Sequence, residues 1–344
     1  MSAVVVIRVE ADDIIGGGHA IRCMAIAEAL IAHGGQVHVL TRCLRLDLVT
    51  AFRTLGAVVH HLSGDHFCET AADQRLAGAA FVRWLRHINL VPDWVLVDHY
   101  AIASQWHKAV RESNARIACI DDLGDRALDC DLIVYPLLSP PDHGYLKLTP
   151  KHCVRLLGPE FALLSRAYRE HAASTCQSAR MGPVVVSFGL ADPDRLTEKT
   201  AALLALELPS TVSAVIVAPH TESQNRLAEM HLPCSVTVVG PQPSLAPLMA
   251  TARLAVGGAG GTSIERLFFG VPTVAVPLVD NQERTAQFLA DHGLAIVVQR
   301  SSSGFHEDLR AALASGIHSP PQYPPKSVCI DGLGAERVAR YLLN

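Results

Sequence analysis

The sequence of 344 residues has no apolar stretch long enough to cross a membrane and no run of basic residues. Charged side chains make up 18% of the chain, and the formal net charge is −4, so we expect neither a nucleic acid nor a membrane as a partner. The first residues lack the basic start and long apolar core of a signal peptide. These absences predict a cytoplasmic protein.

Metal and disulfide motifs are also missing. The nine cysteines are scattered and odd in number, and no two are spaced as Cys-x-x-Cys, which argues against a disulfide framework or a zinc site. The acidic pairs at 12–13 and 121–122 have side chains that suit Mg²⁺, but we interpret both as solvated acidic loops. We expect activity without a metal and without a cofactor.

Two common nucleotide-binding motifs are absent. Gly-x-Gly-x-x-Gly does not occur, because GGGHAI lacks the third glycine, and the second predicted strand ends in VLTRC without an acid for a ribose. Gly-x-x-x-x-Gly-Lys-Ser/Thr does not occur either. A dehydrogenase and a P-loop enzyme are therefore disfavoured.

What the chain does contain is an alternation of apolar strands and helices, with 49% hydrophobic residues for a sizeable core. The pattern predicts parallel βαβ units in each half. We expect two doubly wound, Rossmann-like domains, 1–170 and 183–344, facing across a cleft and joined by a polar linker at 170–182; the last predicted helix, 334–344, is a candidate for packing back on the first domain. The predicted strands are 4–9, 37–40, 57–62, 94–99, 116–121 and 131–136, then 183–189, 212–219, 235–241, 253–258, 272–277 and 294–300.

The stretch GGGHAIRC places Gly17, Gly18 and His19 between a strand and a helix. Ligands of open α/β sheets bind at this edge, so His19 is expected to face a bound molecule. A lone histidine among seventeen is more often a structural or surface group, and only this position distinguishes it.

A second glycine-rich turn, VGGAGGTSIERL, spans 256–267. Backbone N–H groups at such a turn favour a phosphate, although a purely structural turn is an equally good interpretation of the glycines alone. Glu265 could accept both ribose hydroxyls of a nucleotide or simply complement the helix dipole. Asn281 and Gln282 begin a further helix, where a capping role is the plain alternative.

Taken together, these motifs resemble the UDP-sugar hydrolase family of pseudaminic acid biosynthesis, over nearly the whole chain. The family's Arg-x-Asp, polar loop and Ile-Gly-x-Gly-His signature corresponds to R8-V-E-A-D-D-I-I-G-G-G-H19-A-I-R22. Further matches are VDHY at 97–100, Asp121-Asp122, CDLI at 130–133, FALLSR at 161–166, VSFGLADPDRLT at 186–197, AGGTSIE at 259–265 and Asn281-Gln282.

The chain departs from the family's pattern at five positions, most of them in segments expected to line the cleft. We expect these departures to bear on sugar specificity; they are Glu10 for Asp, Asp12 for Ser, Leu190 for Gly, Arg195 for Asn and Tyr135 for Asn.

The resemblance implies a GT-B glycosyltransferase-like fold and hydrolysis of a UDP-linked diacetamido-trideoxyhexose. His19 would be the general base that activates water for attack on the anomeric carbon, with inversion and release of UDP. The partners are then a UDP-sugar and water. The implied substrate-binding residues are Arg8, Gly17, Gly18, Arg22, Asp98, Tyr100, Gly260, Gly261, Thr262, Ser263, Glu265, Asn281 and Gln282.

Three alternatives use the same scaffold. An inverting glycosyltransferase would pass the sugar to an acceptor in place of water. A non-catalytic nucleotide-sugar binding protein would need Glu265 but not His19. A UDP-sugar 2-epimerase would need more carboxylates around the sugar.

Overall fold

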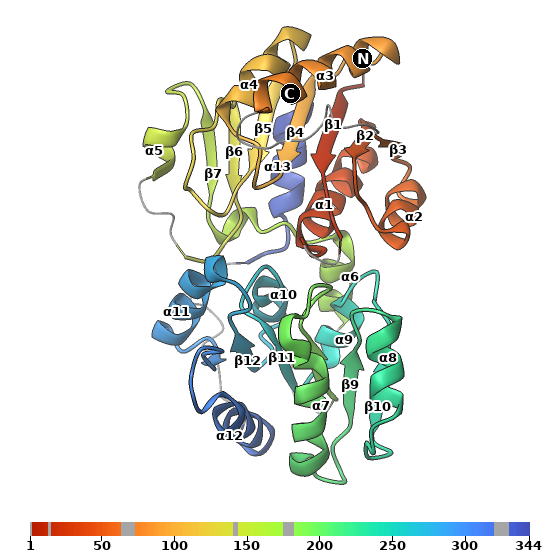
Figure 1. Cartoon of the computed structure of the whole chain (residues 1–344), viewed down its shortest axis with the longest axis vertical. Helices are drawn as coiled ribbons and strands as arrows, with labels where there is room; N and C mark the ends of the chain where they lie inside the picture. The colour runs from red at the N-terminus through yellow and green to blue at the C-terminus, as the bar shows by residue number, and fades with distance from the viewer. Residues whose placement is uncertain (1, 13–14, 63–72, 140–143, 175–181, 320–329) are drawn as a thin grey trace. The chain divides into compact units, whose positions relative to one another are not determined.

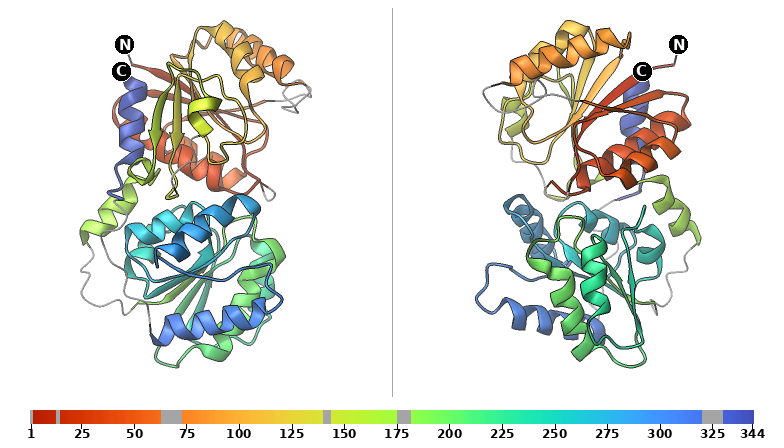
Figure 2. Two further views of the ribbon diagram at one scale, coloured as in Figure 1. Left: turned by 90° about the vertical axis from the view of Figure 1, so that its left-hand side faces the viewer. Right: turned by 45° about the vertical axis from the view of Figure 1, so that its right-hand side comes forward.

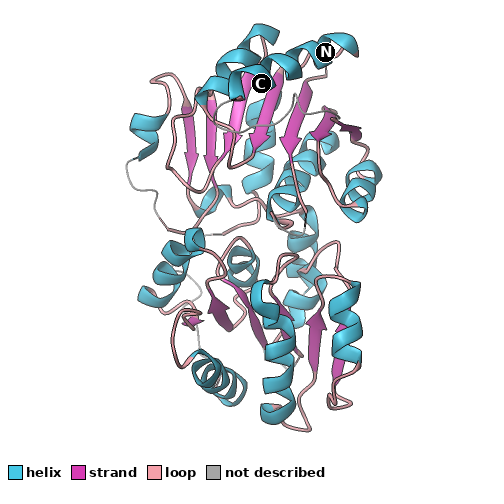
Figure 3. Cartoon of the chain, in the orientation of Figure 1, coloured by secondary structure: helices cyan, strands magenta, loops and turns pink. Residues whose placement is uncertain are grey.

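The computed structural model describes the chain except for residues 1, 13–14, 63–72, 140–143, 175–181 and 320–329. The chain divides into two compact units, Met1–Arg166 with Asp331–Asn344 and Ala167–Ile330. Each unit is one parallel sheet with helices packed on it (Figure 3). The prediction of two doubly wound α/β domains is therefore confirmed. Among the described residues, no helix is both long and apolar enough to span a membrane.

The first unit has a seven-stranded sheet whose order is β3-β2-β1-β4-β5-β6-β7, with every pair parallel (Figure 1). This order reverses direction between β1 and β4, which creates a topological switch point at the carboxyl ends of those strands. The strands are β1 (Val4–Val9), β2 (Gln36–Thr41), β3 (Val58–His61), β4 (Trp94–Asp98), β5 (Arg116–Ile120), β6 (Leu132–Tyr135) and β7 (Val154–Leu157).

Helices cover both faces of this sheet. Helices α1, α2 and α13 form one group, and α3 packs against α4 in a second group. The two groups lie on opposite faces of the sheet (Figure 2). The helices are α1 (Gly18–Ala32), α2 (Leu46–Thr54), α3 (Gln74–His87), α4 (Ser104–Val110), α5 (Gly144–Leu148) and α13 (Gly334–Leu343), with short 3₁₀ turns at Arg111–Ser113 and Pro159–Phe161.

The second unit has a six-stranded parallel sheet with the order β10-β9-β8-β11-β12-β13. Its switch point lies between β8 and β11. The elements are β8 (Val184–Ser187), β9 (Ala214–Val217), β10 (Val236–Val239), β11 (Leu254–Gly258), β12 (Thr273–Val276) and β13 (Ile296–Val297), with α6 (Arg166–Ser174), α7 (Leu196–Glu207), α8 (Thr221–Ala228), α9 (Ala246–Thr251), α10 (Thr262–Phe268), α11 (Glu283–Asp291) and α12 (Phe305–His318), and 3₁₀ turns at Pro193–Arg195 and Asp280–Gln282.

The central strands form because their side chains are apolar on both faces. In β1, Val5, Val6, Ile7 and Val9 are fully buried, as expected for a parallel strand covered by helices on both sides. The predicted strands all appear, mostly shortened at their ends. The pattern predicts one strand over 294–300, but only Ile296–Val297 pairs with β12.

Two parts of the sequence behave differently from the prediction. The edge strand β7 is not among the predicted strands, because VRLL is short and only half-buried on both faces. The polar segment 170–182 is predicted to be a linker, yet α6 continues to Ser174, and residues 175–181 lie outside the described part of the chain.

The last helix, α13, belongs to the first unit and packs on α1. Its apolar residues Ala335, Val338, Ala339 and Leu342 are buried and recur at helical spacing, which gives the helix one apolar face. The helix starts at Gly334, where a Cβ atom would come 2.3 Å from the carbonyl oxygen of Ala162, so the close approach requires glycine.

We predict that Leu342→Ala lowers the free energy of unfolding of the first unit by about 2–5 kcal/mol, because it leaves a cavity under a fully buried side chain. The measurement is urea unfolding followed by tryptophan fluorescence, since Trp84, Trp94 and Trp106 all lie in the first unit. The control is Leu46→Ala, whose side chain is 78% exposed and whose loss should change the stability by less than about 0.5 kcal/mol. Equal effects of the two variants would show that α13 does not contribute to the core.

Candidate functional site

The first unit's candidate site lies at the switch point of its sheet. Strands β1 and β4 are neighbours, and Val9 at the end of β1 is in register with Asp98 at the end of β4. The chain leaves β1 through Glu10 and the glycine turn into α1. The carboxyl edge of these two strands is where ligands of such sheets bind.

The glycines of the turn before His19 differ in their backbone conformation and surroundings. Gly16 has φ +80°, which favours glycine, and Gly17 is the N-cap residue of α1. The Asp12 side chain accepts a 2.6 Å hydrogen bond from the Ile15 amide and shapes the preceding loop. A Cβ atom on Gly18 would meet nothing within 4 Å, so packing within the described chain does not explain that glycine.

His19 lies in the first turn of α1 and is held by Asp98. The Nδ1 atom of His19 is 2.5 Å from Oδ1 of Asp98. Arg22, one turn along α1, donates to both oxygens of the same carboxylate, from Nε and from Nη2, each at 2.6 Å. All three side chains are largely buried. Helix α1 thus presents His19 and Arg22 to one carboxylate at the end of β4.

The charge on Asp98 determines the tautomer of His19. Burial by itself raises the pKa of Asp98, but Arg22 and His19 outweigh it and hold the pKa well below its ordinary value. An ionised carboxylate only accepts hydrogen bonds, so Nδ1 of His19 carries the proton and donates it. Among the described residues, none hydrogen-bonds to Nε2, which in the neutral ring is the proton acceptor. The chemistry of such an arrangement suits proton acceptance at Nε2.

A second carboxylate, that of Asp122, is linked to His19 through the side chain of Tyr100. Arg22 Nη1 donates to Asp122 at 2.8 Å, and the Tyr100 hydroxyl donates to the same Asp122 oxygen at 3.2 Å. The ring of Tyr100 stands edge-on to the ring of His19, with the centroids 4.4 Å apart. Tyr100 is 37% exposed and is therefore available to a ligand. Arg22 ties both carboxylates together.

Arg8 has a different place from the one expected. It is fully buried, and its guanidinium donates to Oε1 of Glu10 at 2.7 Å, so it does not reach a ligand directly. Glu10 also contacts Nε2 of His99 at 3.2 Å, and His99 Nδ1 accepts from the Ala101 amide. We correct the expected role of Arg8 from substrate contact to support of Glu10.

Asp98 and Tyr135 are both buried. Asp98 is 1% exposed, and its carboxylate hydrogen-bonds to His19 and to Arg22, so it orients the His19 ring. Tyr135 is one of the departures expected to bear on sugar specificity, but it is buried and bonds to Ser139 at 3.0 Å. Tyr135 is therefore a residue of the core.

Both residues of the acidic pair at 121–122 interact with other side chains. Asp121 pairs with Arg126 at 2.7 Å and accepts from the Tyr145 hydroxyl, whereas Asp122 serves Arg22 and Tyr100. The interpretation of these residues as a solvated loop is wrong, because Asp121 is 1% exposed. Asp13 of the other pair lies outside the described residues. Within the described residues, no three His, Cys, Asp or Glu side chains are grouped to hold a metal ion.

In the second unit, the glycine loop follows β11 at the switch point of that sheet. A Cβ atom on Gly257 would lie 2.1 Å from the Ser187 carbonyl oxygen, and one on Gly258 would lie 2.9 Å from Leu278, so packing requires both. On Gly260 it would meet the end of the Gln282 side chain at 2.9 Å. On Gly261, the N-cap residue of α10, it would meet nothing within 4 Å.

Polar side chains brace this loop from inside. Gln282 accepts hydrogen bonds from the amides of Ala259 and Leu278, at 3.1 and 3.0 Å. Ser263 is 1% exposed and bonds to the Gly258 carbonyl, while Arg266 bonds to both. Within the described residues, no side-chain hydrogen bond caps the start of α10, whose N-cap residue is Gly261.

Glu265 points into the interior beside Tyr168. It is 8% exposed, and the Tyr168 hydroxyl hydrogen-bonds to it. Burial raises the pKa of Glu265, and the Tyr168 hydrogen bond and Arg266 oppose this only partly. The Oε2 atom has no hydrogen-bond partner within the described part of the chain. A buried acceptor of this kind is costly unless a ligand satisfies it. Asn281 follows at the 3₁₀ turn after β12.

Arg126, in the loop after β5, is absent from the residues predicted for this site. Asp122 from the same loop and His99 at the end of β4 belong to motifs found in the sequence, but their contacts with Arg22 and Glu10 are not predicted from it. The usable signal was the acids at the ends of predicted strands, because parallel strands bring their carboxyl ends to one edge. Which acid pairs with which base depends on strand order, and that order was not predicted.

Residues 218–338 match the family model described as the glycosyltransferase family 28 C-terminal domain. The match covers less than half of the chain. No curated protein sequence matches.

Solved structures match over the whole chain at low identity. The crystal structure of MurG from Acinetobacter baumannii aligns with a TM-score of 0.58 at 17% identity, covering 100% of this chain and 98% of that one. A UDP-GlcNAc 2-epimerase from Neisseria meningitidis, bound to UDP-GlcNAc, aligns at 0.64 and 14% over 100% of both chains. The S. aureus MnaA–UDP co-structure gives 0.66 and 12%, covering 99% and 96%. The chain therefore has the GT-B fold of two Rossmann-like domains.

We predict that the ionisation of Glu10 makes the free energy of unfolding depend on pH. Burial raises the pKa of Glu10, but the hydrogen bond from His99 and the charge of Arg8 lower it to about 2, from an ordinary value of 4.5. A lowered pKa stabilises the fold above the ordinary value, and this stabilisation is lost as the pH falls through that window. Between about pH 5 and pH 3 the wild type should lose about 2 kcal/mol that Glu10→Gln does not lose. Parallel pH curves from denaturant unfolding of the two proteins would contradict the pairing.

Proposed function

We propose that this chain is an enzyme that cleaves the anomeric C–O bond of a UDP-sugar, with His19 as the general base. The observation that carries the proposal is the His19–Asp98–Arg22 arrangement. A buried, ionised carboxylate fixes the proton on Nδ1 and leaves Nε2 to accept one. The position of this base at the switch point of a Rossmann-like sheet supports a role toward a bound ligand.

In the proposed reaction, Nε2 of His19 removes a proton from the attacking hydroxyl or water. The oxygen forms a bond to the anomeric carbon, the bond to the diphosphate oxygen breaks, and UDP leaves with the electron pair, so the configuration inverts. Asp98 stabilises the imidazolium that results. Base assistance of this kind contributes about 10²–10⁴-fold. Positioning and charge stabilisation supply the remainder.

The nucleotide is assigned to the second unit. Glu265 offers a buried acceptor without a described partner, which suits a pair of ribose hydroxyls. Gly261 leaves open space at the start of α10, where backbone N–H groups favour a phosphate. The family 28 match over 218–338 and the UDP in the S. aureus MnaA co-structure support a uridine nucleotide.

We propose water as the acceptor, because the sequence motifs from 8–22 to 281–282 resemble the UDP-sugar hydrolases of pseudaminic acid biosynthesis. The sugar is then a diacetamido-trideoxyhexose. Transfer to a hydroxyl acceptor is the second candidate, and the comparisons favour it more directly, since the matching family model describes a glycosyltransferase domain. The same base and nucleotide site serve both reactions.

A UDP-sugar 2-epimerase remains a rival, because the Neisseria meningitidis enzyme that shares this fold is a UDP-GlcNAc 2-epimerase. It differs in its product, which would be an intact UDP-sugar. A binding protein without catalysis would give no product at all.

The acceptor is tested by incubating the purified protein with UDP-diacetamido-trideoxyhexoses in ¹⁸O-water, without an acceptor. We expect UDP release, no ¹⁸O in the UDP phosphate and a free sugar whose first-formed anomer is inverted by proton NMR. UDP release only after an alcohol is added would establish the transferase. Label in UDP would mean attack on phosphorus and would refute the mechanism, whereas an intact epimer would establish the epimerase.

The division of roles is tested by two substitutions measured side by side. His19→Asn cannot accept a proton and should lower kcat by about 10²-fold or more with little change in UDP affinity. Glu265→Gln loses a charge-assisted contact of about 1.5–3 kcal/mol, which weakens UDP binding about 10- to 100-fold by calorimetry.

Matched controls repeat each change elsewhere in the same unit. One control is His33→Asn, at the carboxyl end of α1. The other is Glu222→Gln, which changes an exposed acid on α8. Both should leave kcat and the UDP affinity as they are. Normal turnover in His19→Asn would remove it as the base, and unchanged UDP binding in a folded Glu265→Gln would remove the ribose assignment.

A further inference from the structure

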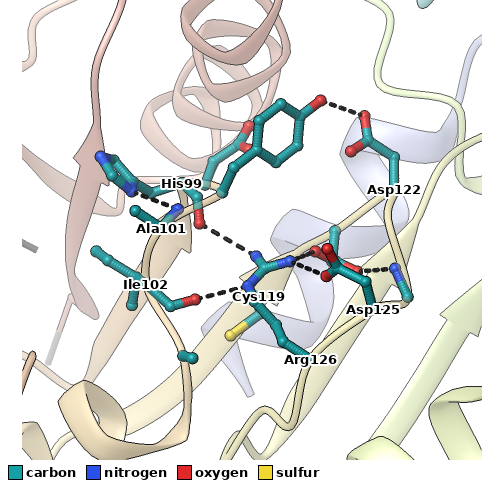
Figure 4. A network of polar contacts seen from close by, with 12 residues as sticks. His99, Ala101, Ile102, Cys119, Asp122, Asp125 and Arg126 are labelled. Carbon is teal, nitrogen blue, oxygen red and sulfur yellow. Dashed lines mark hydrogen bonds and ion pairs between the residues drawn. The ribbon is translucent and has the colours of Figure 1, made fainter. Parts of the chain in front are cut away.

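The turn that follows β4 carries Tyr100 and is held by a side chain from another loop. Arg126, in the loop after β5, donates from Nε to the Ile102 carbonyl at 2.9 Å and from Nη2 to the His99 carbonyl at 3.1 Å (Figure 4). These two carbonyls flank Tyr100 on either side. The Arg126 guanidinium thus links the two ends of the turn that contains Tyr100.

The guanidinium of Arg126 is itself fixed. Its Nη1 atom pairs with Asp121 at 2.7 Å and with Asp125 at 3.0 Å. Asp121 is held in turn by the Tyr145 hydroxyl and the Gly124 amide, at 2.7 and 2.8 Å. The guanidinium therefore pairs with two aspartates and also donates hydrogen bonds to two backbone carbonyls.

The same loop also holds the far end of Tyr100. Asp122, next to Asp121, accepts from the Tyr100 hydroxyl, as Figure 4 shows. The segment 121–126 therefore fixes Tyr100 at both its backbone and its hydroxyl. Gln74 at the start of α3 adds bonds to the Ala101 carbonyl and the Ala103 amide, at 2.8 and 2.9 Å.

The site needs such a device because the contact to Asp98 alone does not fix His19. A hydrogen bond at Nδ1 places one atom of the ring but leaves the ring free to tilt about that atom. The edge-on contact with Tyr100, at 4.4 Å between centroids and 79° between planes, limits this tilt. The direction of Nε2 then depends on where the Tyr100 turn lies.

We propose that Arg126 is a positioning residue for the reaction: by holding the carbonyls of His99 and Ile102, it seats Tyr100 against His19 and so sets the direction of Nε2. This inference rests on the proposed function of His19. It assigns Arg126 no contact with the substrate. Small displacements of a catalytic group are costly, since a misplacement of about 1 Å can lower the rate about 10²-fold.

The test compares Arg126→Gln with Arg126→Lys by turnover and by NMR of the His19 ring in protein labelled with ¹³C-histidine. In Arg126→Gln we expect kcat to fall about 10- to 100-fold with UDP affinity unchanged, and the His19 ring resonances to move toward those of Tyr100→Ala. Lysine keeps the charge, but its donors sit on one nitrogen and cannot span the two carbonyls and two carboxylates that the guanidinium contacts, so Arg126→Lys should recover activity only in part.

The matched control is Arg111→Gln, which removes an arginine of the same unit that also pairs with two aspartates, Asp129 and Asp131. These ion pairs do not involve the turn of Tyr100, and the variant should leave kcat and the His19 resonances unchanged. In a Tyr100→Ala background, Arg126→Gln should have no further effect on kcat, because both act through one ring.

Two results would overturn the inference: Arg126→Gln with a lowered Tm but wild-type His19 resonances, or additive losses of kcat in the double variant. The NMR measurement needs no substrate. If the wild type turns over no UDP-sugar while Arg126→Gln still moves the His19 resonances, the positioning role stands and the proposed function fails.

Discussion

Two parallel hydrogen bonds from the Arg22 guanidinium to the Asp98 carboxylate organise the first unit's site. They keep Asp98 ionised in a buried position, and that charge decides which nitrogen of His19 carries the proton. The third arm of Arg22 holds Asp122, which accepts from Tyr100. A buried ion pair of this kind contributes little net stability, so its value lies in the geometry it imposes. Removing Arg22 would disturb His19 and its aromatic neighbour Tyr100 together.

Four glycines of the two turns fall into two groups with different physical causes. Gly257 and Gly258 are required by the protein's own packing, since a Cβ atom would collide with backbone or with Leu278. Gly18 and Gly261 have open space around the missing Cβ, and each lies at the start of a helix. The structural interpretation of the glycine-rich sequences is thus correct for the first group. Only the second group leaves room for a bound molecule.

The fold was largely predictable from the sequence, whereas the site was predictable only in part. Apolar runs such as VVVIRV mark buried parallel strands, and Gly34 ends α1 with φ +83° as its position indicates. The short edge strand VRLL carries no such signal. Asp98 was found as a strand-end acid, but its role depends on a contact with His19 across 79 positions of sequence. Arg126 acts on backbone carbonyls, and a sequence pattern does not record those.

The packing of α13 on α1 has a consequence for how the chain is made. A ribosome synthesises residues 167–330 before α13 emerges, although α13 belongs to the unit that began at the amino terminus. Until then the α1 surface that receives Val338 and Leu342 stays bare. The second unit is therefore an insertion in the first, and the first can complete its core only after the second has been synthesised.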